Sequence, residues 1–121
     1  MGAIDRATAL VEEGRSHRNA GRLDEGRTAF TAAVAHLHGA LDRDPAGDEV
    51  LRVEIARVYW QLFLLETYKE DGHPWLDQLR DVLLPLRRGG GFDSEDAGNL
   101  WDSATRVLGT CLVEFGPSSA A

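Results

Sequence analysis

Apolar residues recur every three or four positions along almost the whole chain, and no segment alternates apolar and polar residues as a half-buried strand does. This period predicts an all-α protein. The expected helices span residues 4–20, 23–41, 49–69, 74–87 and 95–115. The expected turns lie at Gly21, Pro45, Gly72 and the glycines 89–91. Because these connections are short, we expect five antiparallel helices arranged as two hairpins and a closing helix.

The segment 49–69 differs from the other expected helices because it is apolar on nearly every side. A helix of this kind is usually central, since each of its faces needs cover from water. The exceptions are three polar residues spaced three and four apart, Glu54, Arg57 and Gln61. We expect them to mark the stripe of this helix that faces solvent or a groove.

Length and composition predict one domain. The chain has 121 residues, of which 43% are hydrophobic and 27% charged, a balance typical of a soluble globular protein. We expect the domain to span residues 1–116, followed by a flexible tail at 117–121. No apolar run approaches the roughly 18 residues that suggest a membrane-spanning helix, and the first residues lack the apolar core of a signal peptide. These observations predict a cytoplasmic protein with no membrane contact.

The net charge narrows the choice of partners. A formal charge of −7 opposes the neutralisation of phosphates on which nucleic-acid affinity depends, so we expect no nucleic-acid partner. Lys69 is the only lysine among 13 basic residues, a bias typical of a GC-rich bacterial genome. The expected setting is therefore a bacterial cytoplasm.

No group of residues indicates catalysis or a cofactor. His36 and His38 are two positions apart and point to nearly opposite sides of a helix, so they cannot bind one metal ion together locally. The lone Cys111 cannot form an internal disulfide, and its position in the apolar pattern predicts a buried, inert thiol. Asp77 and Asp81 share a helix face with basic residues nearby, as solvated faces do. We therefore expect a protein that is not an enzyme and holds no metal ion or cofactor.

The first expected hairpin resembles a tetratricopeptide repeat. The repeat's large residue, its small residue, the turn, and the small-then-aromatic step of its second helix are matched by Leu10, Gly14, Gly21, Gly26 and Phe30. The physical reason is that small residues at Gly14 and Gly26 let two antiparallel helices approach closely. Phe30 then fills the gap beside them.

The resemblance covers nearly all of the chain but is specific only over residues 10–33. Leu108-Gly109 restores the leucine-glycine pair of the repeat, and the spacing from Gly109 to Gly116 repeats that from Gly14 to Gly21. The middle repeat is degenerate, and the helices must be longer than the standard repeat allows. A compact five-helix bundle is therefore the alternative architecture.

The resemblance implies a non-catalytic adaptor whose groove, lined by the first helix of each hairpin, receives an extended or helical segment of a partner protein. The partner-binding residues that it implies are Arg15, Arg18, Asn19, Glu66, Lys69 and Arg106. The lysine-and-asparagine clamp that some family members use for chaperone tails is absent, since Val11 and Arg15 stand at its first two places.

Two other functions remain open from the sequence. The chain is also compatible with a homo-oligomer or an accessory subunit of a larger complex, whose interface is an exposed apolar stripe at Trp75, Leu79, Val82 and Leu86. The aromatic residues Tyr59, Phe63 and Trp101 suggest in addition a small helical enzyme or ligand carrier with an apolar pocket.

Overall fold

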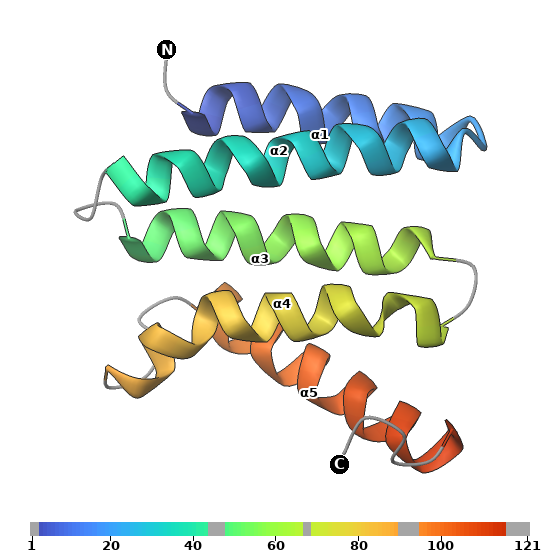
Figure 1. Cartoon of the computed structure of the whole chain (residues 1–121), viewed down its shortest axis with the longest axis vertical. Coiled ribbons are helices and arrows are strands. Elements are labelled where there is room, and N and C mark those ends of the chain that lie inside the picture. The colour runs from blue at the N-terminus through green and yellow to red at the C-terminus, as the bar shows by residue number, and fades with distance from the viewer. Residues whose placement is uncertain (1–2, 44–47, 67–68, 90–94, 116–121) are drawn as a thin grey trace.

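The computed structural model describes residues 3–43, 48–66, 69–89 and 95–115 (Figure 1). Within these ranges the chain forms five α-helices and no strand, which confirms the all-α prediction. The helices are α1 (Ala3–Asn19), α2 (Leu23–Arg43), α3 (Asp48–Leu65), α4 (Lys69–Arg88) and α5 (Glu95–Phe115). Figure 1 shows α1 to α4 side by side in chain order with alternating direction, and α5 crossing obliquely next to α4.

The α1–α2 hairpin has the close packing that its small residues predict. A Cβ atom built on Gly14 lies 2.7 Å from the Phe30 ring, and one on Gly26 lies 3.1 Å from the carbonyl oxygen of Gly14. Phe30 is 0% exposed. The two helices therefore approach each other over the two glycines, and Phe30 fills the joint as expected.

The turn of this hairpin is a Schellman motif centred on Gly21. Gly21 has φ of 81°, in the left-handed region that residues with a side chain rarely adopt. The N–H of Gly21 donates to the carbonyl of Arg18 at 3.0 Å, and the N–H of Arg22 donates to the carbonyl of His17 at 2.8 Å. These two bonds satisfy carbonyl groups that the end of α1 would otherwise leave unpaired.

The helix α3 is central, as its apolar character predicts, because it contacts each of the other four helices. Its buried residues are Leu51, Val53, Ile55, Ala56, Val58, Tyr59, Leu62 and Leu65. Over the described ranges α1 contacts α2 and α3 but neither α4 nor α5, so the helices form a staggered array in which α3 joins the two ends.

The prediction for the start of α4 was wrong. The helix begins at Lys69, so Gly72 and Pro74 lie inside it, and α3 ends at Leu65 and not at residue 69. Pro74 has a helical φ, but as the sixth residue of α4 it cannot donate the i→i−4 hydrogen bond and its ring crowds the carbonyl group one turn earlier. Gly72 is therefore a helical residue of α4 and not the turn between the two helices.

The apolar stripe of α4 is not an exposed surface. Leu79 is 0% exposed and Val82 is 6% exposed, while Trp75 and Leu86 are partly buried. α4 packs against both α3 and α5, and these contacts bury the stripe in the core. The periodicity identified a largely buried face of an amphipathic helix, in which Leu79 and Val82 are covered and only Trp75 and Leu86 keep part of their surface exposed.

The second match to the repeat, at Leu108-Gly109, is not closely packed as the first hairpin is. No atom of the described structure lies within 4 Å of a Cβ atom built on Gly109. Gly116, the tail at 117–121 and the expected turns at Pro45 and at glycines 90 and 91 lie outside the described residues. None of the five helices, over the part of each that is described, is long and apolar enough to cross a membrane.

Candidate functional site

A groove lies between α1 and α3, with α2 below it and α5 at its side. Its cavity volume is about 280 Å³. Its apolar floor and walls are formed by Ile4, Ala7, Val11, Leu37, Val58, Trp60 and Leu100. Its polar edge is formed by Thr8, Glu12, Arg15, Glu54, Arg57 and Gln61. Residues of α1, α3 and α5 thus all line the groove, and these are the helices expected to line a binding surface.

The α1 edge of the groove carries two arginines. Arg15 is exposed at this edge and makes no hydrogen bond or ion pair with any described residue. Arg18 reaches across to α3 and donates to the side-chain oxygen of Gln61 at 2.5 Å. Because Gln61 is neutral, this bond positions the Arg18 guanidinium without cancelling its charge.

On the α3 edge, three polar residues line the cavity, namely Glu54, Arg57 and Gln61. This confirms that they form a groove-facing stripe. Arg57 donates to Glu54 on its own helix and to Asp96 at the start of α5. Arg57 is therefore paired with two carboxylates, whereas Arg15 on the opposite edge is paired with none among the described residues. Arg57 and Asp96 also line an adjoining hollow of about 260 Å³ between α3 and α5.

The groove face also holds exposed apolar side chains that the sequence analysis missed. Among the described residues, the large apolar side chains that are exposed are Ile4 at 37%, Val50 at 58% and Leu64 at 50%. Val50 and Leu64 each lie seven residues from Arg57, so they extend the groove-facing stripe of α3 in both directions. Their heptad spacing was the available signal, but it was hidden in a helix that is apolar nearly all round.

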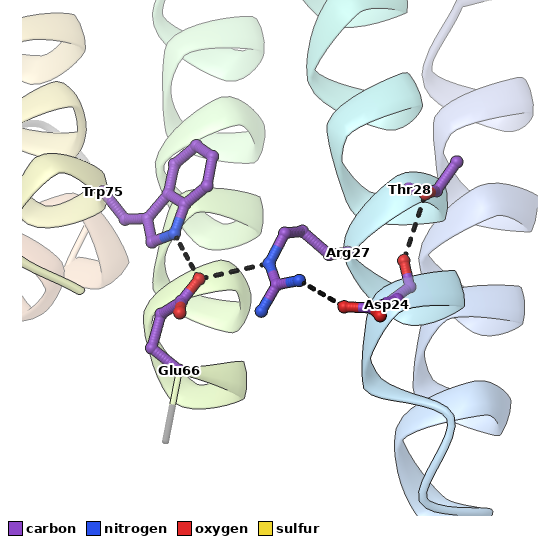
Figure 2. A network of polar contacts seen from close by, with 5 residues as sticks. All are labelled: Asp24, Arg27, Thr28, Glu66 and Trp75. Atoms are coloured by element: carbon purple, nitrogen blue, oxygen red, sulfur yellow. Dashed lines mark hydrogen bonds and ion pairs between the residues drawn. The ribbon is translucent and has the colours of Figure 1, made fainter. Parts of the chain in front are cut away.

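Glu66, which was expected in the groove, lies instead in an internal polar network at the end of α3 (Figure 2). Its Oε1 atom accepts hydrogen bonds from Arg27 Nε at 3.2 Å and from Trp75 Nε1 at 3.1 Å. Arg27 also donates to Asp24 at 2.8 Å. Partial burial acts to lower the pKa of Arg27, but its bonds to Asp24 and Glu66 outweigh that effect and raise it.

Glu66 therefore connects α2, the end of α3 and α4. Its side chain is only 14% exposed, so little of it is available to a partner.

The remaining expected binding residues do not join the groove. Asn19 is exposed at the end of α1 and Arg106 is exposed on α5, and neither lines the cavity between α1 and α3. The side chains of Lys69 and Cys111 lie outside the described residues. Of the six residues expected to bind a partner, the structure places Arg15 in the groove and Arg18 at its end.

A second, shallower cleft of about 350 Å³ lies between α2, α3 and α4. Tyr59 donates from its hydroxyl to Gln78 Oε1 at 3.0 Å, so the contact of 3.2 Å from the hydroxyl to His38 Nε2 requires the histidine to be the donor. Burial, and to a smaller extent Asp81, raise the pKa of Tyr59. This chain of hydrogen bonds joins three helices, and the raised pKa keeps the tyrosine protonated at neutral pH.

The three aromatic residues of the expected apolar pocket lie against different partners. Tyr59 stacks with Trp75, Phe63 packs against Trp60, and the Trp101 ring lies under the guanidinium groups of Arg80 and Arg87. These contacts are those of core and helix-packing residues. In the part of the chain that the structure describes, no three His, Cys, Asp or Glu side chains meet in a group that could hold a metal ion.

Comparison with protein-family models, with curated protein sequences and with solved structures gives no match. The resemblance to tetratricopeptide proteins therefore rests on the sequence pattern, which is specific only over residues 10–33.

Proposed function

We propose that this protein is a non-catalytic, tetratricopeptide-like adaptor that binds a segment of a partner protein in the groove between α1 and α3. The observation that carries the proposal is the position of the exposed apolar side chains. Ile4 lines the groove together with the unpaired Arg15, and the spacing of seven residues from Arg57 puts the exposed Val50 and Leu64 on the same side of α3 as the groove-lining residues. Exposed apolar residues that gather on one hollowed face are typical of a protein-binding surface.

The chemistry of the groove supports binding. Its titratable residues are two carboxylates and two guanidiniums, Glu12, Glu54, Arg15 and Arg57. Arginine remains protonated at ordinary pH and is therefore a poor general base, whereas its planar fork suits recognition of a carboxylate. Apolar walls with a charged edge provide affinity from the floor and selectivity from the rim.

Selection from a displayed library of random linear peptides tests this proposal. Peptides of about 20 residues are long enough to cross the groove in either an extended or a helical form. We expect selected peptides whose affinity falls at least tenfold, or about 1.4 kcal/mol, in the Arg15→Glu variant. Arg6→Glu is the matched control, because Arg6 lies on the opposite side of the same helix, is exposed and does not line the groove.

Two results would contradict the proposal. One is a selection that yields no specific peptide, and the other is a set of peptides that bind the Arg15→Glu and Arg6→Glu variants equally well. Thermal unfolding of each variant shows whether it is folded, so that loss of binding is not confused with loss of structure.

A further inference from the structure

The exposed stripe of α3 has the spacing of a surface that receives another helix. Val50, Arg57 and Leu64 are seven residues apart and lie one above another on the same side of α3. At 1.5 Å per residue, the stripe from Val50 to Leu64 is about 21 Å long. A helix packed nearly parallel to α3 contacts such a stripe once every two turns, since side chains seven apart return to the same face.

The apolar floor of the groove offers little to satisfy an extended backbone, because the polar side chains lie along the edges. Its uncharged polar side chains are Thr8 and Gln61, and the oxygen of Gln61 already accepts from Arg18. An extended segment lying on Val11, Val58 and Trp60 would hold backbone N–H and C=O groups against an apolar floor. Such groups are costly to bury without partners, whereas a helix pairs its own.

Positive charge is concentrated at one end of the groove. The Arg18–Gln61 bond places the C-terminal part of α1 beside the C-terminal part of α3, close in sequence to Leu64. Arg15 and Arg18 thus bring two positive charges to this end, and neither pairs with a carboxylate among the described residues. Arg57, in the middle of the stripe, is already paired with two carboxylates, Glu54 and Asp96.

We infer that the occupant of the groove is an amphipathic α-helix of a partner protein, with an apolar stripe along α3 and an acidic residue facing Arg15. This inference rests on the proposed function and specifies the partner's chemistry. The partner helix buries apolar side chains against Val50, Trp60 and Leu64, and its carboxylate pairs with the one groove arginine whose charge no described residue matches.

The test uses the strongest groove-dependent peptide from the selection above, made synthetically. Alanine scanning is expected to give losses of at least tenfold at positions spaced three, four and seven apart, with little effect between them. Proline at a central position outside that pattern is expected to abolish binding, because it breaks the helix while leaving the contact residues intact.

Variants of the protein test the same geometry from the other side. Val50→Glu and Leu64→Glu, at residues 58% and 50% exposed, are each expected to weaken the peptide at least tenfold. Ala35→Glu is the control, because Ala35 is exposed on α2 and does not line the groove.

The outcomes separate the two proposals. Losses at every second residue of the peptide, with the proline tolerated, would overturn the helical partner and leave the groove as a binding site. Failure to find any groove-dependent peptide would overturn both. Light scattering that shows a dimer, dissociated by Leu64→Glu but not by Ala35→Glu, would mean that a second copy of this chain covers the face, and would also overturn the helical partner.

Discussion

Trp75 donates a hydrogen bond of 3.1 Å from its indole nitrogen to Oε1 of Glu66, and so joins two residues that the sequence assigns to two different surfaces. Glu66 was expected in a binding groove and Trp75 at an oligomer interface. They meet because Glu66 follows the last residue of α3 and Trp75 lies in the second turn of α4. The bond, together with the one from Arg27, makes the α3–α4 connection part of the internal structure (Figure 2).

Removing the Glu66 carboxylate should destabilise the fold. We expect Glu66→Ala to lower the free energy of unfolding by about 1–3 kcal/mol, because the partly buried Trp75 N–H and Arg27 Nε lose their shared acceptor. Glu66→Gln should cost less, since an amide oxygen can still accept from Trp75. Asp24→Ala, which removes a fully solvated partner of the same arginine, should cost under about 1 kcal/mol. Urea denaturation of the three variants gives the order, and a loss from Asp24→Ala as large as that from Glu66→Ala would contradict the structural role.

Phe30 and Gly14 should be coupled in the α1–α2 joint. Phe30→Ala is expected to cost about 3–5 kcal/mol, as truncations of buried aromatic residues do. Gly14→Ala alone should also destabilise, because its Cβ atom would lie 2.7 Å from the Phe30 ring. In the Phe30→Ala background the same Gly14→Ala change should be neutral or stabilising, since the ring is gone and alanine favours a helix by about 1 kcal/mol. A double-mutant cycle measures this coupling, and equal effects of Gly14→Ala in both backgrounds would show that the two residues do not interact.

The α4 stripe should behave as core and not as an interface. Leu79→Ala is expected to cost about 2–5 kcal/mol, because Leu79 is fully buried. Leu64→Ala is the matched control, since it removes the same atoms from a residue that is 50% exposed, and should cost less than half as much. Light scattering should show no change of assembly state caused by Leu79→Ala at concentrations where the variant is folded. A folded Leu79→Ala variant that loses a dimer without losing stability would restore the interface hypothesis.

Reversing the charge at the basic end of the groove should weaken binding without unfolding the protein. Arg15→Glu with Arg18→Glu is expected to reduce peptide affinity at least tenfold, about 1.4 kcal/mol. The Arg15→Glu substitution alone should have little effect on the melting temperature. Arg18→Glu removes the bond to Gln61 and should lower the melting temperature slightly. A lysine in place of the peptide's acidic residue should restore affinity for the Arg15→Glu variant. Absence of this rescue would show that Arg15 does not face that carboxylate.

Tyr59 should make the protein less stable at alkaline pH. Burial raises its pKa in the folded state above the ordinary value of about 10, so the folded protein holds the phenolic proton more tightly than the unfolded chain does. The stabilisation is fully present below about pH 10 and is lost as pH rises through the folded-state pKa. The difference in unfolding free energy between wild type and Tyr59→Phe should therefore shrink above about pH 10. A difference that stays constant across this range would show that the pKa of Tyr59 is not raised.

The apolar period by itself determined the helical class, the five segments and the central place of α3. The helical class and the segments follow from the local spacing of apolar residues. The central place of α3 follows from its apolar residues on nearly every side. The first hairpin was also predictable in detail, because Gly14, Gly26 and Phe30 follow from how closely two adjacent helices can pack. The end of α5 at Phe115 agreed as well, since glycine and proline follow it at once in the sequence.

Only the tertiary structure decided which apolar faces are covered. The stripe at Leu79 and the pair Val50 and Leu64 are all apolar residues at helical spacing, yet α3 and α5 bury the first while the other two are exposed. The tertiary structure also decided which charged residues have partners. The sequence assigns Glu66, at the end of α3, and Arg15, on α1, to the same expected binding groove. Glu66 is bound by side chains 39 and 9 residues away, whereas Arg15 has no partner among the described residues. Periodicity along one helix cannot show which other helix lies against it, and that long-range packing separates the core of this protein from its candidate binding face.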